Sequence, residues 1–405
     1  MFRTSCLVCQ SSNLTKIIDL GIQPFADTFI PEPRLSESDQ VYPLSCDLCN
    51  DCGQIQTSCI TNPQDRYILQ DYSYTSSNSS FSRNHWEDYA KVVVDKTSLE
   101  PDSFIVEIGS NDGYLSEQFL KLGHRALGVD PSPYMAELAK KRNIDTVVEV
   151  FEPAVASKIH AQYGEAQLIV ANNVFNHADA PLEFAKAAAD LLSTDGTFIF
   201  ELPYWISGLE THKFDQIYHE HVSYFTVTSS SRILESVGLQ IVDVQLVDYH
   251  GGSIRVFAKH KDGAHKVTEN VRVMMEEEKS CGAFDPQTYS QYMNHILDQR
   301  NKFLSKIYEI KAAGKPIIAV GAAAKGNTFL NFYNLDSTII DYVTDASPHK
   351  QGKYTPLTRI PICGDDKFAE YDEVYALILS WNISDKLKII LNNINPKINF
   401  LSLPD

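Results

Sequence analysis

The hydrophobic pattern consists of short apolar runs, each followed by a polar or glycine-rich turn and then by residues with a helical period. The run 104–108 is rich in β-branched residues, and the next segment places Leu115, Phe119, Leu120 and Leu122 on one helical face. Apolar strands that alternate with helices are typical of a parallel sheet covered on both faces. We therefore predict an α/β fold, with strands at 104–108, 126–129, 147–151, 168–171 and 197–201 and helices at 83–98, 134–142 and 180–192.

A second pattern of this kind begins after residue 315. It follows a mostly helical stretch, 266–312, that breaks near Gly282 and Pro286. Strands are expected at 316–320, 339–343 and 374–379, with a helix after the first of them. The pattern predicts a second Rossmann-like fold at the C-terminal end.

The turn after the strand 104–108 reads Glu107-x-Gly109-x-Asn111-x-Gly113. A dinucleotide site would have the spacing G-x-G-x-x-G, which is absent here. The acid two residues before the first glycine resembles motif I of the class I S-adenosylmethionine (SAM) methyltransferases. Asp130 ends the next strand about twenty residues further on, where a carboxylate can accept hydrogen bonds from a ribose. The alternative is a plain turn that binds nothing.

The fourth predicted strand ends in the polar residues Asn172, Asn173 and His177. Ligands of open α/β sheets bind at the carboxyl ends of the strands. We therefore take Asn172 as a cofactor-binding candidate, Asn173 as a substrate-binding candidate and His177 as a catalytic candidate.

The densest polar cluster is Tyr218-His219-Glu220-His221, within 214–225. A metal site is conceivable, but the spacing is not H-E-x-x-H, the zinc-protease pattern. A histidine general base oriented by a carboxylate is the better interpretation, with a purely structural cluster as the alternative. A further histidine, His250, precedes a glycine pair, and the pattern leaves open whether this segment is a hairpin turn or part of a site.

The loop 321–328 follows a predicted strand and nearly matches a P-loop. Asn327 stands where a P-loop requires lysine, which argues against a triphosphate hydrolase. Small residues, Lys325, Gly326 and a helix N-terminus still suit a diphosphate. Another polar run, 71–80, contains two tyrosines and is interpreted either as a linker or as part of the site.

Six of the eight cysteines precede residue 60. Cys6-x-x-Cys9 and Cys49-x-x-Cys52 are two C-x-x-C pairs, and four thiolates suit tetrahedral Zn²⁺. Cys46 offers a competing pair with Cys49. We prefer Cys49 and Cys52 because Gly53 completes a natural turn, and a cluster of free thiols is the alternative.

Length and charge narrow the function further. The 405 residues suggest two or three domains, and 43% apolar content is ample for their cores. A net charge of −17 disfavours nucleic-acid binding, because duplex binding rests on Lys and Arg. No signal peptide and no long apolar run are evident, so we expect a soluble cytoplasmic protein with no membrane partner.

The motifs together resemble those of the bacterial sugar C-methyltransferases, over nearly the whole chain. Departures from the family pattern are Asp27 in place of Asn, Thr355-Pro356-Leu357 in place of a Pro-Gly turn, and the extra Cys46. The resemblance rests on Cys6-x-x-Cys9, Gly21-x-Gln23-Pro24, Cys49 to Gly53 with Gln56, Glu107 to Gly113, Tyr218 to His221, His250 to Ser253, Gly321 to Gly326 and Lys350-Gln351-Gly352.

The resemblance implies an architecture of three parts. These are an N-terminal zinc-binding module at 1–70, a central class I SAM methyltransferase domain at 71–265, and a helical linker with a Rossmann-like nucleotide-sugar domain at 266–405. It also implies one structural Zn²⁺, and we expect a monomer.

The implied reaction is methylation of a dTDP- or GDP-linked 4-keto deoxysugar at the carbon beside the ketone, which we expect to be C3. The resemblance assigns His221 as the base, with Glu220 orienting it and Tyr218, His177 and Tyr72 polarising the carbonyl or holding the sugar. Substrate-binding residues would be Asn173, His250, Lys325, Gly326 and Asn327. Two alternatives are a small-molecule O-methyltransferase with the same SAM site and a non-enzymatic zinc- and nucleotide-binding module.

Overall fold

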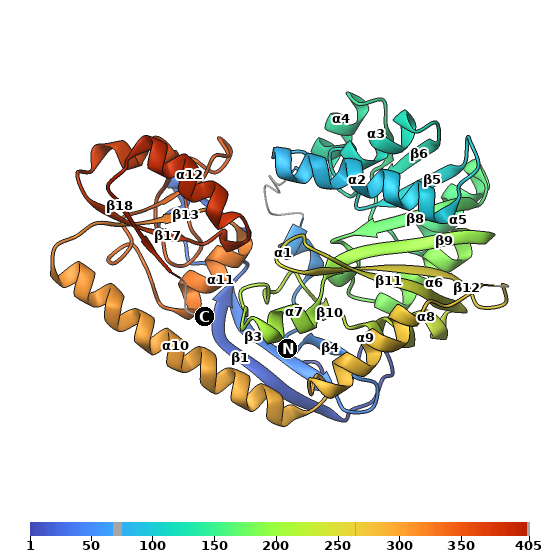
Figure 1. The fold of residues 1–405 in the computed structure, drawn as a ribbon, viewed down its shortest axis with the longest axis horizontal. Coiled ribbons are helices and arrows are strands. Elements are labelled where there is room, and N and C mark those ends of the chain that lie inside the picture. Colours follow the sequence, from blue (N-terminus) through green and yellow to red (C-terminus); the bar gives the residue numbers. More distant parts are fainter. Residues whose placement is uncertain (68–74, 264, 403–405) are drawn as a thin grey trace.

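The computed structural model describes residues 1–67, 75–263 and 265–402, so Tyr72 lies outside the described residues. Three larger sheets organise these residues (Figure 1). In Figure 1 the seven-stranded sheet lies at the right, the five-stranded C-terminal sheet lies at the left, and the N-terminal strands lie between them. The predicted α/β class, with two Rossmann-like sheets, is confirmed.

The seven-stranded sheet has the order β11-β12-β9-β8-β5-β6-β7. The five strands from β9 to β7 are parallel, whereas β12 and β11 are antiparallel. After β5 the chain forms β6 and β7 on one side of this strand, and then crosses over to form β8 on its other side. The strand order therefore reverses between β5 and β8. Its strands are β5 (Phe104–Ile108), β6 (Arg125–Val129), β7 (Asp145–Val147), β8 (Ala166–Asn172), β9 (Leu192–Pro203), β11 (Leu239–Val247) and β12 (Ser253–His260).

Side chains of β5 alternate between two cores, because successive strand residues point to opposite faces. Phe104, Val106 and Ile108 belong to one buried cluster, and Ile105 belongs to another with α2 and α3. Ser79 caps α2 by accepting a hydrogen bond from the Ser82 amide. The helices of this part are α2 (Ser80–Thr97), α3 (Tyr114–Lys121), α4 (Pro133–Lys140), α5 (Pro153–Tyr163), α6 (Pro181–Leu191), α7 (Trp205–Glu210) and α8 (Val227–Ser236), with the 3₁₀ helix η2 (Phe175–His177).

The predicted position of the third strand is wrong. The strand β7 covers Asp145–Val147 rather than 147–151, and Val148 and Val150 are exposed. At this edge of the sheet only three residues pair with β6. The apolar residues that follow were therefore a misleading strand signal.

The N-terminal sheet has the order β1-β3-β4-β10. Residues 20–24, which contain a glycine and a proline, continue β1, and the pairing of β1 with β3 shifts register on both sides of Ile18 and Asp19. Gly21, at φ 77°, lies in the second irregularity. The elements are β1 (Leu14–Pro24), β2 (Ile30–Pro31), η1 (Glu32–Arg34), β3 (Val41–Cys49), β4 (Ile55–Thr57), α1 (Pro63–Tyr67) and β10 (Ser223–Tyr224).

The C-terminal sheet is parallel, with the order β16-β14-β13-β17-β18. The second strand begins later than predicted, because Ile339 and Ile340 lie in a turn before β14. A two-residue strand, β15 (Lys353–Tyr354), pairs with β2. The other elements are β13 (Ile317–Val320), α11 (Ala324–Phe332), β14 (Tyr342–Thr344), β16 (Ile362–Cys363), η3 (Asp365–Glu370), β17 (Val374–Ile378), η4 (Trp381–Ile383), α12 (Ser384–Ile394) and β18 (Ile398–Leu401).

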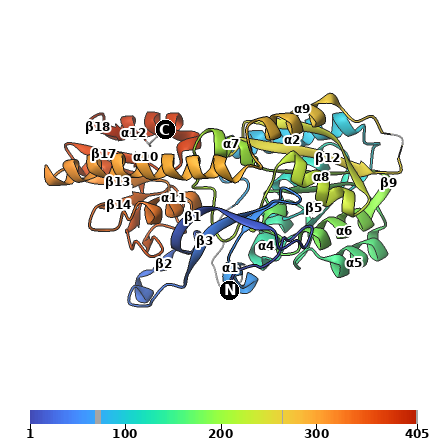
Figure 2. The same cartoon turned by 90° about the horizontal axis from the view of Figure 1, so that it is seen from below.

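Two helices connect the large sheets. They are α9 (Glu269–Ser280) and the 27-residue α10 (Pro286–Ala312), and the break between them falls where the sequence predicts it. Figures 1 and 2 show α10 running beneath the N-terminal strands to the C-terminal sheet. Among the described residues, no helix is long and apolar enough to cross a membrane.

Candidate active site

The turn after β5 is tight enough to need glycine. Gly109 and Gly113 have φ of 70° and 73°, and Asn111 has φ of 51°. A side chain at Gly113 would come within 2.9 Å of the Cβ of Ala139. The turn therefore keeps its backbone open at the carboxyl end of β5, next to the reversal of strand order where ligands bind.

Glu107 and Asp130 hold this turn from two sides. The Ser116 amide, in the first turn of α3, donates to Glu107 at 2.9 Å. Burial raises the pKa of Glu107 to about 8. The amides of Asn111 and Ser132 donate to different oxygens of Asp130, each at 2.9 Å. Because each carboxylate oxygen has a second lone pair, Asp130 keeps the capacity to accept from ribose hydroxyls, and the residues present fit SAM.

The segment that precedes α2 packs on the glycine turn. The amide of Ser76 donates to Asn111 Oδ1 at 2.9 Å, and the hydroxyl of Ser77 donates to Asp112. The described part of the 71–80 run, residues 75–80, therefore contacts the proposed cofactor site instead of serving only as a linker.

Asn172 and Asn173 end β8 beside this turn. Asn172 Oδ1 accepts from the Glu201 amide at 3.1 Å, and the Asn173 amide donates to the Glu201 carbonyl at 2.7 Å. The Glu201 carboxylate is fully buried between His85, at 2.6 Å, and Arg255, at 2.7 Å. Sequence analysis missed this ion group, because His85, Glu201 and Arg255 are far apart in the chain and share no motif.

The predicted base lies in a tight turn, in which the His221 amide donates to the Tyr218 carbonyl at 2.9 Å. His221 Nδ1 lies 2.9 Å from the carbonyl oxygen of Gln216. A carbonyl oxygen only accepts, so Nδ1 carries the hydrogen and Nε2 keeps a free lone pair. Burial lowers the pKa of His221 to about 4, which keeps the ring neutral at physiological pH.

The turn directs His219 and His221 to different neighbours. His219 Nε2 lies 3.2 Å from the Pro43 carbonyl oxygen in the N-terminal sheet. His221 instead contacts Tyr218 and His177, with ring centroids 3.9 Å and 5.0 Å away. A cavity beside His221 is also lined by Asn176, Gln216 and Tyr224. Three of the five predicted catalytic side chains therefore meet at one place.

Glu220 does not take the orienting role that we expected. Its Oε1 accepts from the Asp27 amide at 3.2 Å, and burial raises its pKa to about 7. The ring of His221 is oriented by the Gln216 carbonyl. A backbone acceptor can come from any residue type, which is why the sequence carried no signal for Gln216.

The His250 segment is the hairpin turn between β11 and β12, and it also borders the site. The side-chain amide of Gln216 donates to the His250 carbonyl at 2.9 Å. Burial, together with nearby Lys325, lowers the pKa of His250 to about 3. The hairpin interpretation is thus confirmed, and the substrate-binding role of His250 stays a prediction.

The C-terminal loop 321–328 lies at the carboxyl end of β13. Lys325 donates to Asn382 Oδ1, and burial lowers the pKa of Lys325 to about 8. Asn327 turns its amide to the Ala26 carbonyl, at 2.6 Å. The side chain of Asn327 thus also holds the N-terminal segment, and the substrate contact that we expected for it stays a prediction.

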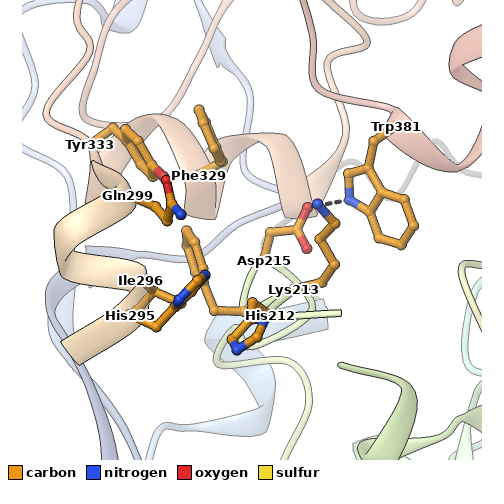
Figure 3. A pocket seen from close by; sticks show the side chains of 10 residues that line it. His212, Lys213, Asp215, His295, Ile296, Gln299, Phe329, Tyr333 and Trp381 are labelled. Carbon is orange, nitrogen blue, oxygen red and sulfur yellow. Dashed lines mark hydrogen bonds between the residues drawn. The ribbon is translucent and has the colours of Figure 1, made fainter. Parts of the chain in front are cut away.

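Figure 3 shows a pocket between α10, α11, the segment 212–215 and Trp381. Asp215 points toward Trp381, whose indole Nε1 donates to Asp215 Oδ2 at 2.6 Å. Asp215 belongs to the polar cluster recognised in the sequence, but its partner lies 166 residues away. Such a contact cannot be predicted from spacing.

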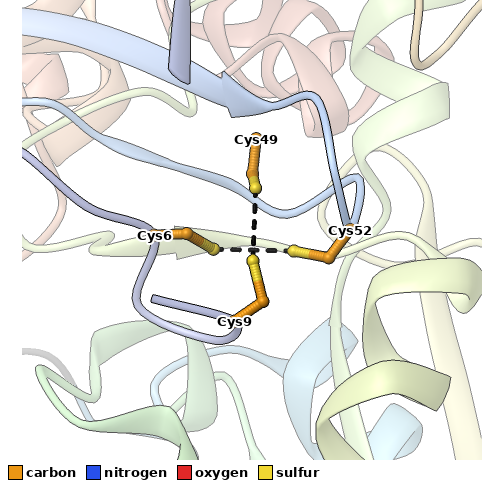
Figure 4. Close-up of side chains that lie close together, drawn as sticks. All are labelled: Cys6, Cys9, Cys49 and Cys52. Carbon is orange, nitrogen blue, oxygen red and sulfur yellow. Dashed lines mark hydrogen bonds between the residues drawn. The ribbon is translucent and has the colours of Figure 1, made fainter. Parts of the chain in front are cut away.

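Four cysteines converge at one point in the N-terminal sheet (Figure 4). The sulfurs of Cys6 and Cys52, and those of Cys9 and Cys49, are 3.5 Å apart, and all four lie within 4.8 Å of one another. Zn–S bonds of about 2.3 Å in a tetrahedron place sulfurs about 3.8 Å apart. The group fits zinc and confirms the choice of Cys49 with Cys52. Cys46 is buried in β3, outside the group.

Comparisons with known proteins match three successive stretches of the chain. A model described as a zinc binding domain matches residues 6–67, one described as a methyltransferase domain matches 83–244, and one described as a C-methyltransferase C-terminal domain matches 248–397. The C-methyltransferase NovU of Streptomyces niveus is 30% identical over 382 residues, covering 94% of this chain and 90% of the relative. The chain belongs to the C-methyltransferase family.

Other similarities are restricted to part of the chain. The ubiquinone biosynthesis O-methyltransferase of Burkholderia pseudomallei (strain 1710b) is 22% identical, over 39% of this chain and 73% of the relative. A crystal structure of a SAM-dependent methyltransferase from Clostridium acetobutylicum ATCC 824 aligns at 14% identity and a TM-score of 0.37, over 49% of this chain and 96% of that chain. The match to the methyltransferase-domain model identifies SAM as the methyl donor of this C-methyltransferase, and the zinc-binding-domain model together with the four converging cysteines identifies its zinc site.

Proposed function

We propose that this C-methyltransferase acts on a nucleotide-linked 4-keto deoxysugar and methylates C3, the carbon beside the ketone. The observation that carries the proposal is the hydrogen bond from His221 Nδ1 to the Gln216 carbonyl. It holds the neutral ring with Nε2 available, which is the state that a general base needs. His221 is only 6% exposed, and this burial favours the neutral state of its ring.

The residues around His221 suit proton removal from carbon. His221 Nε2 takes the proton from C3, and the electron pair of the C–H bond moves into the enolate. Tyr218 and His177, whose rings both contact that of His221, are the candidates to stabilise the negative charge on the enolate oxygen. SAM, when bound at the turn from Gly109 to Gly113, supplies the methyl group.

The C-terminal sheet provides the candidate site for the nucleotide end of the substrate. Residues 321–323 lead into α11, which includes 324–328 and whose N-terminus favours anionic groups. Lys325 adds a cation at the same place and lies close enough to His250 to lower its pKa. A sugar attached through a diphosphate would extend from this loop toward His250 and His221.

The test is a screen of dTDP- and GDP-linked 4-keto deoxysugars with SAM, in deuterated water. Proton exchange beside the ketone without SAM, followed by carbon methylation with SAM, is the expected result. Methylation of a hydroxyl without exchange would contradict the proposal and support O-methylation. SAM binding without turnover of any keto sugar would support a different substrate.

A further inference from the structure

Trp381 lies where the strand order of the C-terminal sheet reverses. The strand β13 is flanked by β14 and β17, and the chain reaches β17 only after completing the other side of the sheet. Ligands of open α/β sheets bind outside the carboxyl ends of strands at such a reversal. Gly321 follows β13 and Trp381 follows β17. The two segments touch, because a side chain at Gly321 would come within 2.1 Å of Ser380 Oγ.

The cation of the proposed diphosphate site rests on this tryptophan. Lys325 Nζ lies 4.8 Å from the centre of the Trp381 ring and donates to the neighbouring Asn382. An ammonium group over an indole face is attracted by the ring quadrupole. The position of Lys325 is therefore tied to that of Trp381.

The opposite contacts of Trp381 reach the catalytic segment. Its Nε1 donates to Asp215 Oδ2 at 2.6 Å, and Asp215 is only 4% exposed (Figure 3). The other carboxylate oxygen of Asp215 has no hydrogen-bond partner among the residues that the structure describes. The ring also packs on the hairpin turn, where a side chain at Gly251 would come within 2.0 Å of it.

Asp215 is followed directly by the residue that orients the base. The Gln216 carbonyl accepts from His221 Nδ1, and the Gln216 side chain donates to the His250 carbonyl, both at 2.9 Å. Asp215 and Gln216 are thus the two consecutive residues between the indole of Trp381 and the ring of His221. A shift of Trp381 would move the carbonyl that holds the catalytic ring.

We propose that Asp215 and Trp381 are positioning residues that couple the diphosphate loop to the His221 base. Neither touches the reacting atoms. Trp381 anchors Asp215, Asp215 fixes the Gln216 carbonyl, and this carbonyl sets the tautomer and direction of His221. The inference rests on the proposed function, since it takes 321–328 as the diphosphate site and His221 as the base. Small displacements of a catalytic group reduce the rate strongly, so the hydrogen bond between Trp381 and Asp215 should influence the rate of proton removal by His221.

The decisive variant is Trp381→Phe, which keeps an aromatic ring over Gly251 and removes the donor to Asp215. Trp205→Phe is the matched control, because the Trp205 indole also donates to a buried oxygen, that of Tyr289, at 2.8 Å. In Trp381→Phe we expect kcat for deuterium exchange to fall by ~10- to 100-fold, with KM for the nucleotide sugar and Kd for SAM changed less than about 3-fold. Trp205 lines the cavity beside His221, but its indole donates to Tyr289 and not to Asp215, so Trp205→Phe should reduce the exchange rate less than Trp381→Phe does.

Asp215 gives an independent pair of variants. Asp215→Asn keeps an oxygen that accepts from Trp381 and should retain most of the exchange rate, whereas Asp215→Ala should lose it as Trp381→Phe does. Combining Asp215→Ala with Trp381→Phe should add little, because both remove the same bond. Additive losses would contradict a shared role.

A spectroscopic measurement separates this inference from the proposed function. In the ¹⁵N NMR spectrum of histidine-labelled protein, His221 should be the Nδ1–H tautomer in the parent and a mixture of tautomers in Trp381→Phe and Asp215→Ala. An unchanged tautomer with parental exchange in both variants would overturn the inference and leave the function intact. If the parent exchanges no 4-keto sugar proton, the proposed function fails, and the tautomer measurement still decides whether Trp381 positions His221.

Discussion

The imidazole of His221 donates from Nδ1 to the backbone carbonyl of Gln216 across 2.9 Å. This bond gives the ring one tautomer and one direction without a carboxylate partner. A carboxylate would raise the pKa of the ring, whereas a carbonyl in a buried site leaves it low. The site therefore fixes the direction of the His221 ring and also keeps that ring neutral.

The first prediction concerns the base itself. His221→Asn should reduce deuterium exchange and methylation together by ~10²–10⁴-fold, the contribution of a general base. Binding of SAM and of the free nucleoside diphosphate, measured by calorimetry, should stay unchanged. His219→Asn is the control, since His219 faces Pro43, and it should retain more activity. Exchange that persists in His221→Asn would assign proton removal to another residue.

The second prediction concerns the acid limb of the pH profile. The neutral ring is the proposed base, and burial lowers the pKa of His221 to about 4. Base activity should therefore be lost only as the pH falls through about 4, not near the ordinary histidine value of about 6.5. The measurement is kcat/KM for exchange, with circular dichroism in the same buffers to confirm folding. Glu220→Gln should be measured in parallel, because burial raises the pKa of Glu220 to about 7.

The third prediction concerns Lys325, which is charged below its pKa of about 8. Affinity for a nucleoside diphosphate should fall as the pH rises through 8, because the deprotonated amine no longer attracts phosphate. Lys325→Arg should remove this pH dependence, since arginine stays charged. Lys325→Ala should cost about 1.5–3 kcal/mol below pH 8, the range for a hydrogen bond to a charged group. Equal weakening of SAM would mean that the loop 321–328 is not a separate nucleotide site.

The fourth prediction concerns SAM. Asp130→Ala should weaken SAM binding by about 1.5–3 kcal/mol, because it removes a charged acceptor beside the glycine turn. The same change also frees the Asn111 and Ser132 amides, so the melting temperature of the unliganded protein is needed as a control. Unchanged calorimetric affinity for SAM would place the ribose partner elsewhere. Nucleoside diphosphate binding should not respond.

The fifth prediction concerns zinc. Cys49→Ser should lose the metal and lower the melting temperature, because it removes one of four converging thiolates. Cys46→Ser is a matched control in the same strand and should keep one zinc per chain by elemental analysis. Full zinc in Cys49→Ser would contradict the assignment.

Local signals predicted most of the central strands and the ligand turns. The buried parallel strand at 104–108 and the glycine turn after it were clear, because a continuous apolar run and glycines at positive φ leave a mark in the sequence. The four zinc-site cysteines were also predictable, because two C-x-x-C pairs are visible in the sequence. The strand predicted at 147–151 failed, since its pattern did not reveal how soon the chain leaves the sheet edge.

Contacts between distant segments could not be predicted. Glu201 with His85 and Arg255, Asn327 with Ala26, and Trp381 with Asp215 join residues whose spacing carries no information. The role of Gln216 is carried by a backbone carbonyl and leaves no trace in residue identity. Tyr72, the remaining catalytic candidate, stays a prediction.

The strand β10 follows His221 by only two residues and pairs with β4 of the zinc-bearing sheet. The segment that carries the proposed base therefore leads directly into the sheet next to the four-cysteine site. Exchanging the N-terminal region with that of a relative would replace one half of a strand pair and leave the other half behind. Recombination between such enzymes should succeed only when residues 1–67 and 218–226 are inherited together, so that the metal site and the catalytic turn form one heritable unit despite their distance along the gene.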